Sequence, residues 1–176
     1  ILELQGDAIA DICARYSVPV SWVLGMIPIE ARMHRADGGG LRPDDVSLRH
    51  EPGFKSDIET PHRVSAGWMQ TLLSTAQSMA KKYELPSPKR ARELYDPYTS
   101  LTYGIAYMAH QIERYEGDLD GDLGMDFVYM TGAYNAGSVK HNRDNPFHLL
   151  TFSPTRTERA IRWHNDALAA LKEFEG

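Results

Sequence analysis

The sequence of 176 residues contains a single cysteine, Cys13, and no apolar run long enough to cross a membrane. One cysteine cannot form an internal disulfide, so the fold must rest on a hydrophobic core and not on covalent bridges. A membrane-spanning helix needs about 20 consecutive, mostly apolar residues, and we therefore expect no transmembrane segment in this chain. No signal-peptide pattern opens the sequence and Ile1 is not a start methionine, so we expect a piece of a longer parent protein.

Long runs of one charge are also missing. The net charge is −5, and acidic and basic residues are interspersed along the chain. Nucleic-acid-binding proteins usually carry a clustered basic surface, so we expect no nucleic-acid partner. The histidines show no HExxH spacing, and the Gly/Asp-rich stretch 117–124 lacks the glutamate that ends a calcium-binding loop. We therefore expect neither a metal nor another cofactor.

The alternation of apolar and polar residues that predicts half-buried strands is not convincing anywhere, whereas helical spacing recurs along the chain. This pattern favours an all-α fold, or a helix-dominated α+β fold at most, built as one domain over residues 1–176. The predicted helices cover residues 2–16, 19 to about 33, 72–83, 88–95, 97–115, 125–135 and 154–174.

Residues 37–60 interrupt this helical pattern with a stretch rich in glycine and proline. A loop of more than about 15 residues in a compact domain is usually functional or disordered. The segment LRHEPGF (Leu48–Phe54) has enough apolar and aromatic side chains to pack against the domain, so we predict an ordered insertion at about 37–60. Its best candidate for a site residue is Glu51, because the following Pro52–Gly53 could turn it toward a groove.

Glu30 lies near the end of an apolar predicted helix, VLGMIPIEARMH (Val23–His34). The residues before it are nearly all apolar, and ionising a carboxyl on such a surface is costly because the charged form loses water. A carboxyl that stays protonated near neutral pH can donate its proton to a glycosidic bond. Taken alone, this stretch favours a boundary residue that points to solvent as the helix ends.

Two further segments are polar where a core helix or a simple turn would not need to be. The first is SAGWMQ, whose glycine lets the backbone approach another group closely and whose first and last residues offer hydrogen-bonding groups. The second is AYNAG, where small residues at a helix end open a space for the hydroxyl and the amide of the central residues. The candidate binding residues in these segments are Ser65, Gly67, Gln70, Tyr134 and Asn135.

In this order the segments resemble the goose-type lysozyme and soluble lytic transglycosylase superfamily. The family pattern is an apolar helix ending in a catalytic Glu, a Ser-x-Gly-(apolar)-Met-Gln segment, an Asp-Pro-led helix with Gly-x-x-Tyr, and Ala-Tyr-Asn-Ala-Gly. The matching segments are VLGMIPIE (Val23–Glu30), SAGWMQ (Ser65–Gln70), DPYTSLTYGIAYM (Asp96–Met108) and AYNAG (Ala133–Gly137). The resemblance covers roughly residues 7–140, and RHEPGF (Arg49–Phe54) resembles an insertion seen in phage-associated relatives.

The resemblance implies a lysozyme-like fold with a catalytic groove that cleaves peptidoglycan between N-acetylmuramic acid and N-acetylglucosamine. Glu30 matches the one essential catalytic residue, which protonates the glycosidic oxygen and then accepts a proton from the muramic C6 hydroxyl, closing a 1,6-anhydro ring. Tyr134 matches the residue whose hydroxyl lies beside that Glu, and Ser65, Gln70 and Asn135 match positions lining the sugar groove. We expect action on the cell wall, whether periplasmic, extracellular or phage-borne.

The chain departs from the family pattern beside Glu30, where Ala31 replaces a common serine and Pro28 a helix-friendly residue. Trp68 replaces the usual leucine and offers a larger stacking surface. Two alternatives to a transglycosylase follow. A second carboxylate such as Glu51 could position a water near the anomeric carbon, which would make the enzyme a hydrolytic muramidase of the goose-type lysozyme kind. The departures beside Glu30 could instead indicate a non-catalytic glycan-binding module.

Overall fold

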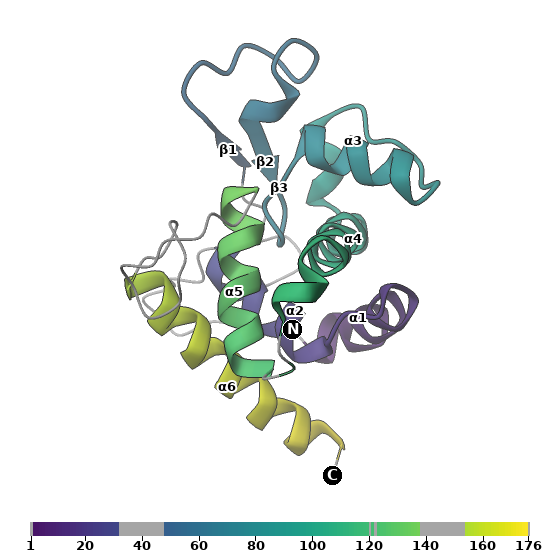
Figure 1. Cartoon of the computed structure of the whole chain (residues 1–176). Helices are drawn as coiled ribbons and strands as arrows, with labels where there is room; N and C mark the ends of the chain where they lie inside the picture. Colours follow the sequence, from purple (N-terminus) through teal and green to yellow (C-terminus); the bar gives the residue numbers. More distant parts are fainter. Residues whose placement is uncertain (1, 32–47, 120, 122, 138–153, 176) are drawn as a thin grey trace, which may run out of the picture.

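The computed structural model describes residues 2–31, 48–119, 121, 123–137 and 154–175, and most of them are helical (Figure 1). Together with a small three-stranded antiparallel sheet, this confirms the predicted helix-dominated, lysozyme-like fold class. The elements in chain order are α1 (Leu2–Tyr16), α2 (Val20–Glu30), β1 (Leu48–His50), η1 (Pro61–Arg63), β2 (Val64–Ala66), β3 (Thr71–Leu72), α3 (Leu73–Lys82), η2 (Ala91–Tyr95), α4 (Pro97–Tyr115), η3 (Glu116–Asp118), α5 (Leu123–Ala136) and α6 (Pro154–Glu175), where η marks a 3-10 helix.

The sheet lies at one end of the molecule beside α3, and its strand order is β1-β2-β3 (Figure 1). Arg49 on β1 is paired with Ser65 on β2, which in turn is paired with Leu72 on β3. Ser65 and Ala66, the first two residues of SAGWMQ, belong to β2, and a turn follows at Gly67–Gln70. Strands of two or three residues are too short to show an alternating pattern in the sequence.

Helix α4 has the bounds predicted from the sequence and packs on both of its faces. Its start follows from the pair Asp96–Pro97, because the Asp96 side chain accepts a hydrogen bond from the Thr99 backbone N–H at 2.8 Å and proline suits the first turn. One face of α4 packs in the larger of two hydrophobic clusters and carries Leu101, Ile105 and Met108. The other face packs in the smaller cluster and carries Tyr103 and Ala106.

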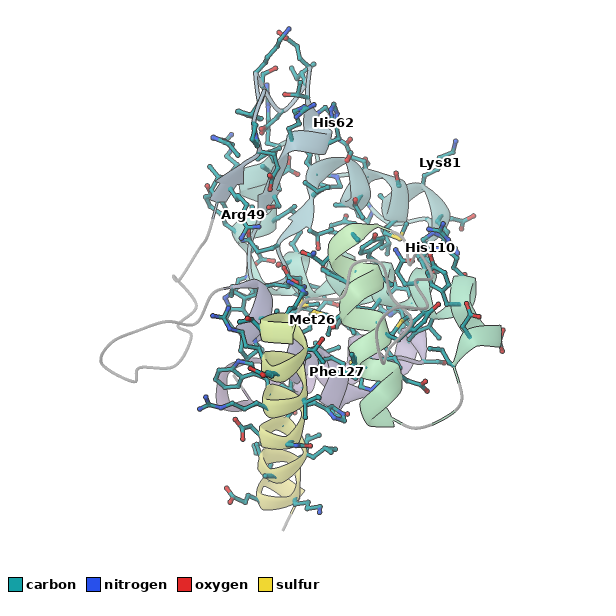
Figure 2. All side chains as sticks on the ribbon, turned by 60° about the vertical axis from the view of Figure 1, so that its left-hand side comes forward. Met26, Arg49, His62, Lys81, His110 and Phe127 are labelled. Atoms are coloured by element: carbon teal, nitrogen blue, oxygen red, sulfur yellow. The ribbon has the colours of Figure 1, made fainter. Side chains whose placement is uncertain are left out.

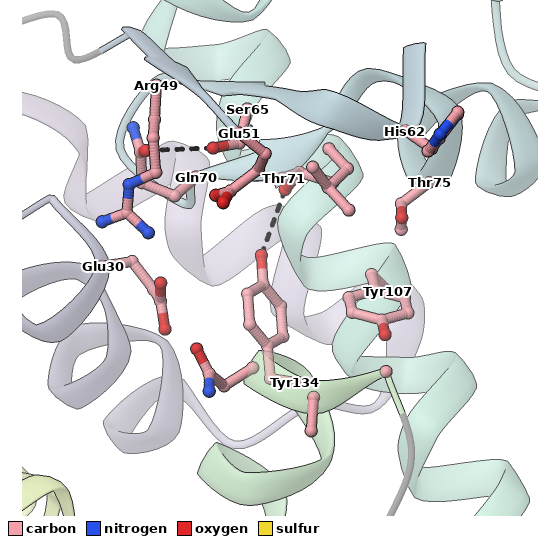
Figure 3. A pocket seen from close by; sticks show the side chains of 14 residues that line it. Glu30, Arg49, Glu51, His62, Ser65, Gln70, Thr71, Thr75, Tyr107 and Tyr134 are labelled. Atoms are coloured by element: carbon pink, nitrogen blue, oxygen red, sulfur yellow. Dashed lines mark hydrogen bonds between the residues drawn. The ribbon is translucent and has the colours of Figure 1, made fainter. Parts of the chain in front are cut away.

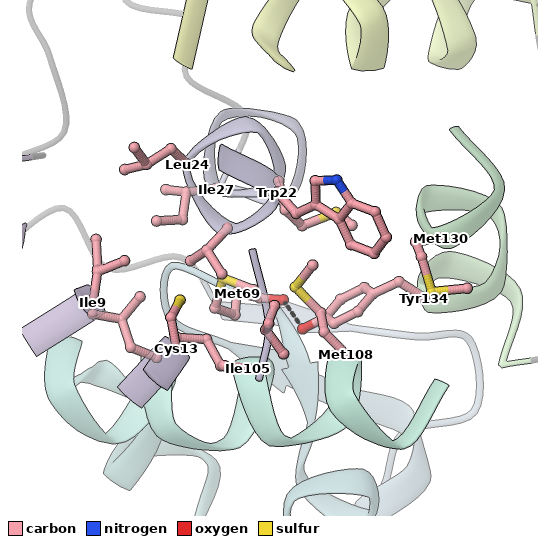
Figure 4. Packing of buried hydrophobic residues seen from close by; sticks show 14 of the residues in the cluster. Ile9, Cys13, Trp22, Leu24, Ile27, Met69, Ile105, Met108, Met130 and Tyr134 are labelled. Atoms are coloured by element: carbon pink, nitrogen blue, oxygen red, sulfur yellow. Dashed lines mark hydrogen bonds between the residues drawn. The ribbon is translucent and has the colours of Figure 1, made fainter. Parts of the chain in front are cut away.

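Helix α2 is buried almost all round, as its nearly continuous apolar sequence requires (Figure 4). The helix continues through Pro28 and ends at Glu30, since the Ala31 N–H still donates to the Ile27 carbonyl at 2.9 Å. The predicted end at about Met33 lies outside the described residues. Cys13 on α1 belongs to the same core, and burial raises the pKa of its thiol to about 12, so it stays protonated.

Of the predicted insertion at 37–60, residues 48–60 are described and the remainder lies outside the described residues. After β1 the chain turns back, and the rings of His50 and Phe54 stack with their centroids 3.9 Å apart. The Glu51 backbone N–H donates to the Arg63 carbonyl at 2.8 Å, which ties this segment to the end of η1 directly before β2. The LRHEPGF stretch therefore folds against the sheet.

Within the described ranges, no single helix combines the length and the apolar composition that a membrane span requires. The segments Gln5–Tyr16 and Val20–Glu30 meet the length and composition criteria only as a pair, and they are bent by 116° relative to each other.

Candidate active site

A pocket of about 380 Å³ lies between the sheet and the ends of α2 and α5 (Figure 3). It brings together side chains from the three segments that the sequence singled out, although these segments are far apart along the chain. The lining residues are Glu30, Arg49, Glu51, His62, Ser65, Gln70, Thr71, Leu72, Thr75, Tyr107, Tyr134, Asn135, Ala136 and Gly137. Of the predicted site residues, all but Gly67 line this pocket.

Glu30 is the last residue of α2 and is only 8% exposed. The carboxyl end of a helix carries a partial negative charge, and burial also disfavours a carboxylate there. The opposing influence is Arg156 in the first turn of α6, whose Nη2 donates to Glu30 Oε1. This ion pair supplies the countercharge that a buried carboxylate at this place requires.

Arg156 was not among the predicted site residues, and neither were the lining residues Arg49, His62 and Thr71. Arg156 and Glu30 are 126 positions apart along the chain, so no local pattern connects them. The one hint in the sequence is the position of Arg156 in the first turn of a helix, where a positive charge is electrostatically unfavourable. A basic residue at such a position is often held there by a contact with another element. The contact arises because α6 packs against α2, which is a result of tertiary folding.

Tyr134 is buried in the floor of the pocket, and its hydroxyl donates to the Met69 carbonyl at 2.8 Å. The Thr71 hydroxyl lies 3.1 Å from the same oxygen (Figure 3). Because the single phenolic proton goes to Met69, Thr71 is the donor in this second bond. Burial raises the pKa of Tyr134 well above its ordinary value, and the nearby Glu30 charge acts in the same direction, while the Thr71 bond opposes them. Tyr134 is therefore a neutral phenol held in one orientation.

Ser65 and Gln70 close the SAGWMQ segment on itself. The Ser65 hydroxyl donates to Gln70 Oε1 at 3.2 Å, and Gln70 Nε2 donates to the Gly67 carbonyl at 2.9 Å. Ser100 on α4 accepts a hydrogen bond from the Met69 backbone N–H at 3.1 Å and so fixes the turn from below. The amide and hydroxyl that line the pocket are therefore held by the turn itself.

Gly67 supports this turn from behind the pocket. Its φ is +79°, and a Cβ at this position would lie under 3.0 Å from the Leu94 carbonyl oxygen and from the Ser100 hydroxyl. Trp68 next to it is completely buried in the larger hydrophobic cluster. The expectation that Trp68 offers a stacking surface to sugars was therefore wrong: the preceding turn directs its ring into the core.

The sheet contributes charged side chains to the opposite side of the pocket. Arg49 comes from β1, Glu51 follows that strand, and His62 comes from η1 (Figures 2 and 3). Tyr107 on α4 completes the wall next to Tyr134, with ring centroids 5.0 Å apart, and burial raises the pKa of its hydroxyl. Over the described parts of the chain, no group of three or more His, Cys, Asp or Glu residues is placed to hold a metal ion.

The family model of the Transglycosylase SLT domain matches residues 46–146, which is more than half of the chain. No curated protein and no solved structure matches the chain. The matched segment contains SAGWMQ, AYNAG and the sheet side of the pocket, whereas Glu30 and Arg156 lie outside it. Domains of this family are typically lytic transglycosylases that act on the peptidoglycan of the cell wall. The chain belongs to the Transglycosylase SLT domain family, as its sequence motifs predicted.

Proposed function

We propose that this domain cleaves the β-1,4 bond between N-acetylmuramic acid and N-acetylglucosamine and leaves 1,6-anhydromuramic ends, with Glu30 as the single acid and base. The observation that carries the proposal is the position of Glu30, a buried carboxyl at the edge of a pocket that also holds Gln70, Tyr134 and Asn135. This constellation occurs in a chain that belongs to a peptidoglycan-cleaving family.

The proposed reaction has two proton transfers through one carboxyl group. Glu30 first donates its proton to the glycosidic oxygen, so that the bond to the anomeric carbon breaks and N-acetylglucosamine leaves with a free 4-hydroxyl. The acetamido group of the muramic residue stabilises the positive charge at the anomeric carbon. The Glu30 carboxylate then accepts the proton of the muramic C6 hydroxyl while O6 bonds to the anomeric carbon, and no water is consumed.

The second candidate is a hydrolytic muramidase, and the place of Glu51 in the same pocket favours it. Ordinary retaining glycosidases need a second carboxylate about 5–5.5 Å from the first, and inverting enzymes need one farther away that activates a water. Glu51 comes from the opposite side of the pocket to Glu30 (Figure 3). In the hydrolytic alternative Glu51 would activate a water, and the product would carry reducing muramic ends.

Mass spectrometry of the soluble products from purified sacculi tests the proposal. The wild-type domain should release muropeptides with anhydro ends, which are lighter by one water than the hydrolytic products. Glu30→Gln, which keeps the shape of the side chain but cannot donate a carboxyl proton, should abolish release. Glu51→Gln is the matched control and should leave the anhydro product in place. Reducing ends that disappear in Glu51→Gln would establish the hydrolase instead, and activity in Glu30→Gln would refute the role of Glu30.

A further inference from the structure

The partner of Glu30 is held in place by the docking of α6. Among the residues that fix this helix, Ala160, His164 and Ala167 are buried. His164 Nε2 lies 3.3 Å from the Ser21 hydroxyl of α2, and the His164 ring stacks on Phe127 of α5 with centroids 5.0 Å apart (Figure 2 shows Phe127 beside α6). Arg156 lies in the first turn of the same helix, so its position relative to Glu30 is set by this packing.

The guanidinium of Arg156 contacts the carboxyl of Glu30 directly. Its side chain is 23% exposed, and Nη2 forms both the hydrogen bond and the ion pair with the carboxyl. Its Nε is buried and has no hydrogen-bond partner within the described residues. A guanidinium held in one orientation against a carboxylate fixes the direction of that carboxylate as well as its charge.

This contact bears directly on proton transfer. An adjacent cation stabilises the carboxylate relative to the carboxylic acid. It therefore makes Glu30 a better proton donor once the reaction begins, because the anion that remains is stabilised.

We propose that Arg156 is a positioning residue for Glu30, which aims the carboxyl into the groove. The inference rests on the proposed function of Glu30. The other ionisable groups that line the same pocket are Arg49, Glu51, His62, Tyr107 and Tyr134. They remain unchanged when Arg156 is substituted, so a change in the catalytic rate reports the removed guanidinium.

The test compares kcat and KM for muropeptide release from sacculi in the wild type and in Arg156→Gln. Because the carboxyl is no longer aimed while the sugar-binding residues stay in place, kcat should fall by about tenfold or more and KM should change by less than about twofold. Arg159→Gln is the matched control, since it removes an exposed arginine one turn further along α6, and it should change neither quantity.

Two further variants keep the test decisive. Arg156→Met retains the aliphatic stem for packing and must show the same loss of kcat if the guanidinium is what aims Glu30. Arg156→Lys retains a cation that can still donate a hydrogen bond and must recover part of kcat. An unchanged kcat in Arg156→Gln or Arg156→Met, or a kcat in Arg156→Lys no higher than in Arg156→Met, would overturn the inference. In either case an inactive Glu30→Gln leaves the proposed function standing, whereas an active Glu30→Gln removes the proposed function itself.

Discussion

The two sides of the pocket differ in how firmly their polar groups are held. On the helical side, Glu30 and Tyr134 are buried and have defined partners in Arg156, Met69 and Thr71. On the sheet side, the ionisable groups are half-buried or exposed, and none of them has a side-chain hydrogen bond or ion pair within the described residues; they are Arg49, Glu51 and His62. Fixed groups suit proton transfer, which depends on geometry, whereas adaptable charges suit the binding of a variable polymer.

The residues matched by the family model also cover the two sides of the pocket unequally. Its range, 46–146, includes the whole sheet side together with α3, α4 and α5. The ion pair of Glu30 and Arg156 is supplied by α2 and α6, which flank that range in the sequence and pack against each other in space. The Glu30–Arg156 pair is thus assembled from outside the matched segment, whereas Tyr134 on the same side of the pocket lies within it.

The largest expected effect is a loss of stability when alanine replaces a glycine that supports the pocket, and it should differ between the two sides. Gly67→Ala on the sheet side should lower the free energy of unfolding by more than about 3 kcal/mol, because a side chain meets both a positive φ and a backbone carbonyl. Gly25→Ala in α2 should cost about 1–3 kcal/mol, because its Cβ would lie 2.9 Å from the Phe127 ring in a well-packed core.

Urea unfolding measures both variants against Gly117→Ala. Gly117 has no neighbour within 4 Å of an added Cβ, so its substitution should stay within about 0.5 kcal/mol of the wild type. Equal losses in Gly67→Ala and Gly117→Ala would show that the turn under the sheet side is not rigid.

Tyr134→Phe tests whether the helical side depends on its fixed partners. The variant leaves the Met69 carbonyl without its buried donor, so the free energy of unfolding should fall by about 1–2 kcal/mol. Release of muropeptides should fall as well, because the hydroxyl no longer ties AYNAG to SAGWMQ. The control is Tyr98→Phe, which removes an exposed hydroxyl and should change neither measurement. Unchanged stability in Tyr134→Phe would contradict this account.

Arg49→Gln tests the sheet side, and unlike Tyr134→Phe it should weaken binding without lowering stability. With no ion pair to lose among the described residues, its free energy of unfolding should remain within about 0.5 kcal/mol of the wild type. Peptidoglycan carries carboxylates, so binding to sacculi at low salt should weaken several-fold, and the difference should shrink at high salt. Lys55→Gln removes an exposed cation of the same segment outside the pocket and serves as the control. A large loss of stability in Arg49→Gln would abolish the distinction between the two sides.

The smallest expected effect concerns the docking of α6. Burial lowers the pKa of His164, so below about pH 6.5 the unfolded chain binds a proton at this position before the folded chain does. The free energy of unfolding therefore falls as the pH drops from neutral to mildly acidic. In His164→Asn this fall should be shallower. The pKa of His110 is lowered too, but His110 is present in both proteins and cancels in the difference. Identical slopes would show that His164 does not contribute.

Most helices and the central residues of the pocket followed from local sequence, whereas the helix predicted at 88–95 is a shorter 3-10 helix at Ala91–Tyr95. Asp96–Pro97 predicted the start of α4, and the apolar spacing predicted α1 with the correct bounds. Glu51 and the polar groups of SAGWMQ and AYNAG, singled out on chemical grounds, all reach the pocket except for Gly67, whose place is behind the turn. The short strands and the burial of Trp68 could not be predicted, because two or three residues carry no periodic signal and a single aromatic side chain fits a surface as well as a core.

Sequence by itself therefore determined the family, the helix-dominated fold and six of the fourteen residues that line the pocket, since motifs and periodicity are local properties. Tertiary structure alone decided what surrounds Glu30. The pairing with Arg156, the bonds of Tyr134 to Met69 and Thr71, and the charged sheet side join residues far apart in the chain. Their meeting depends on how α6 packs on α2 and how the turn before β3 packs on α4, and no local pattern encodes that packing.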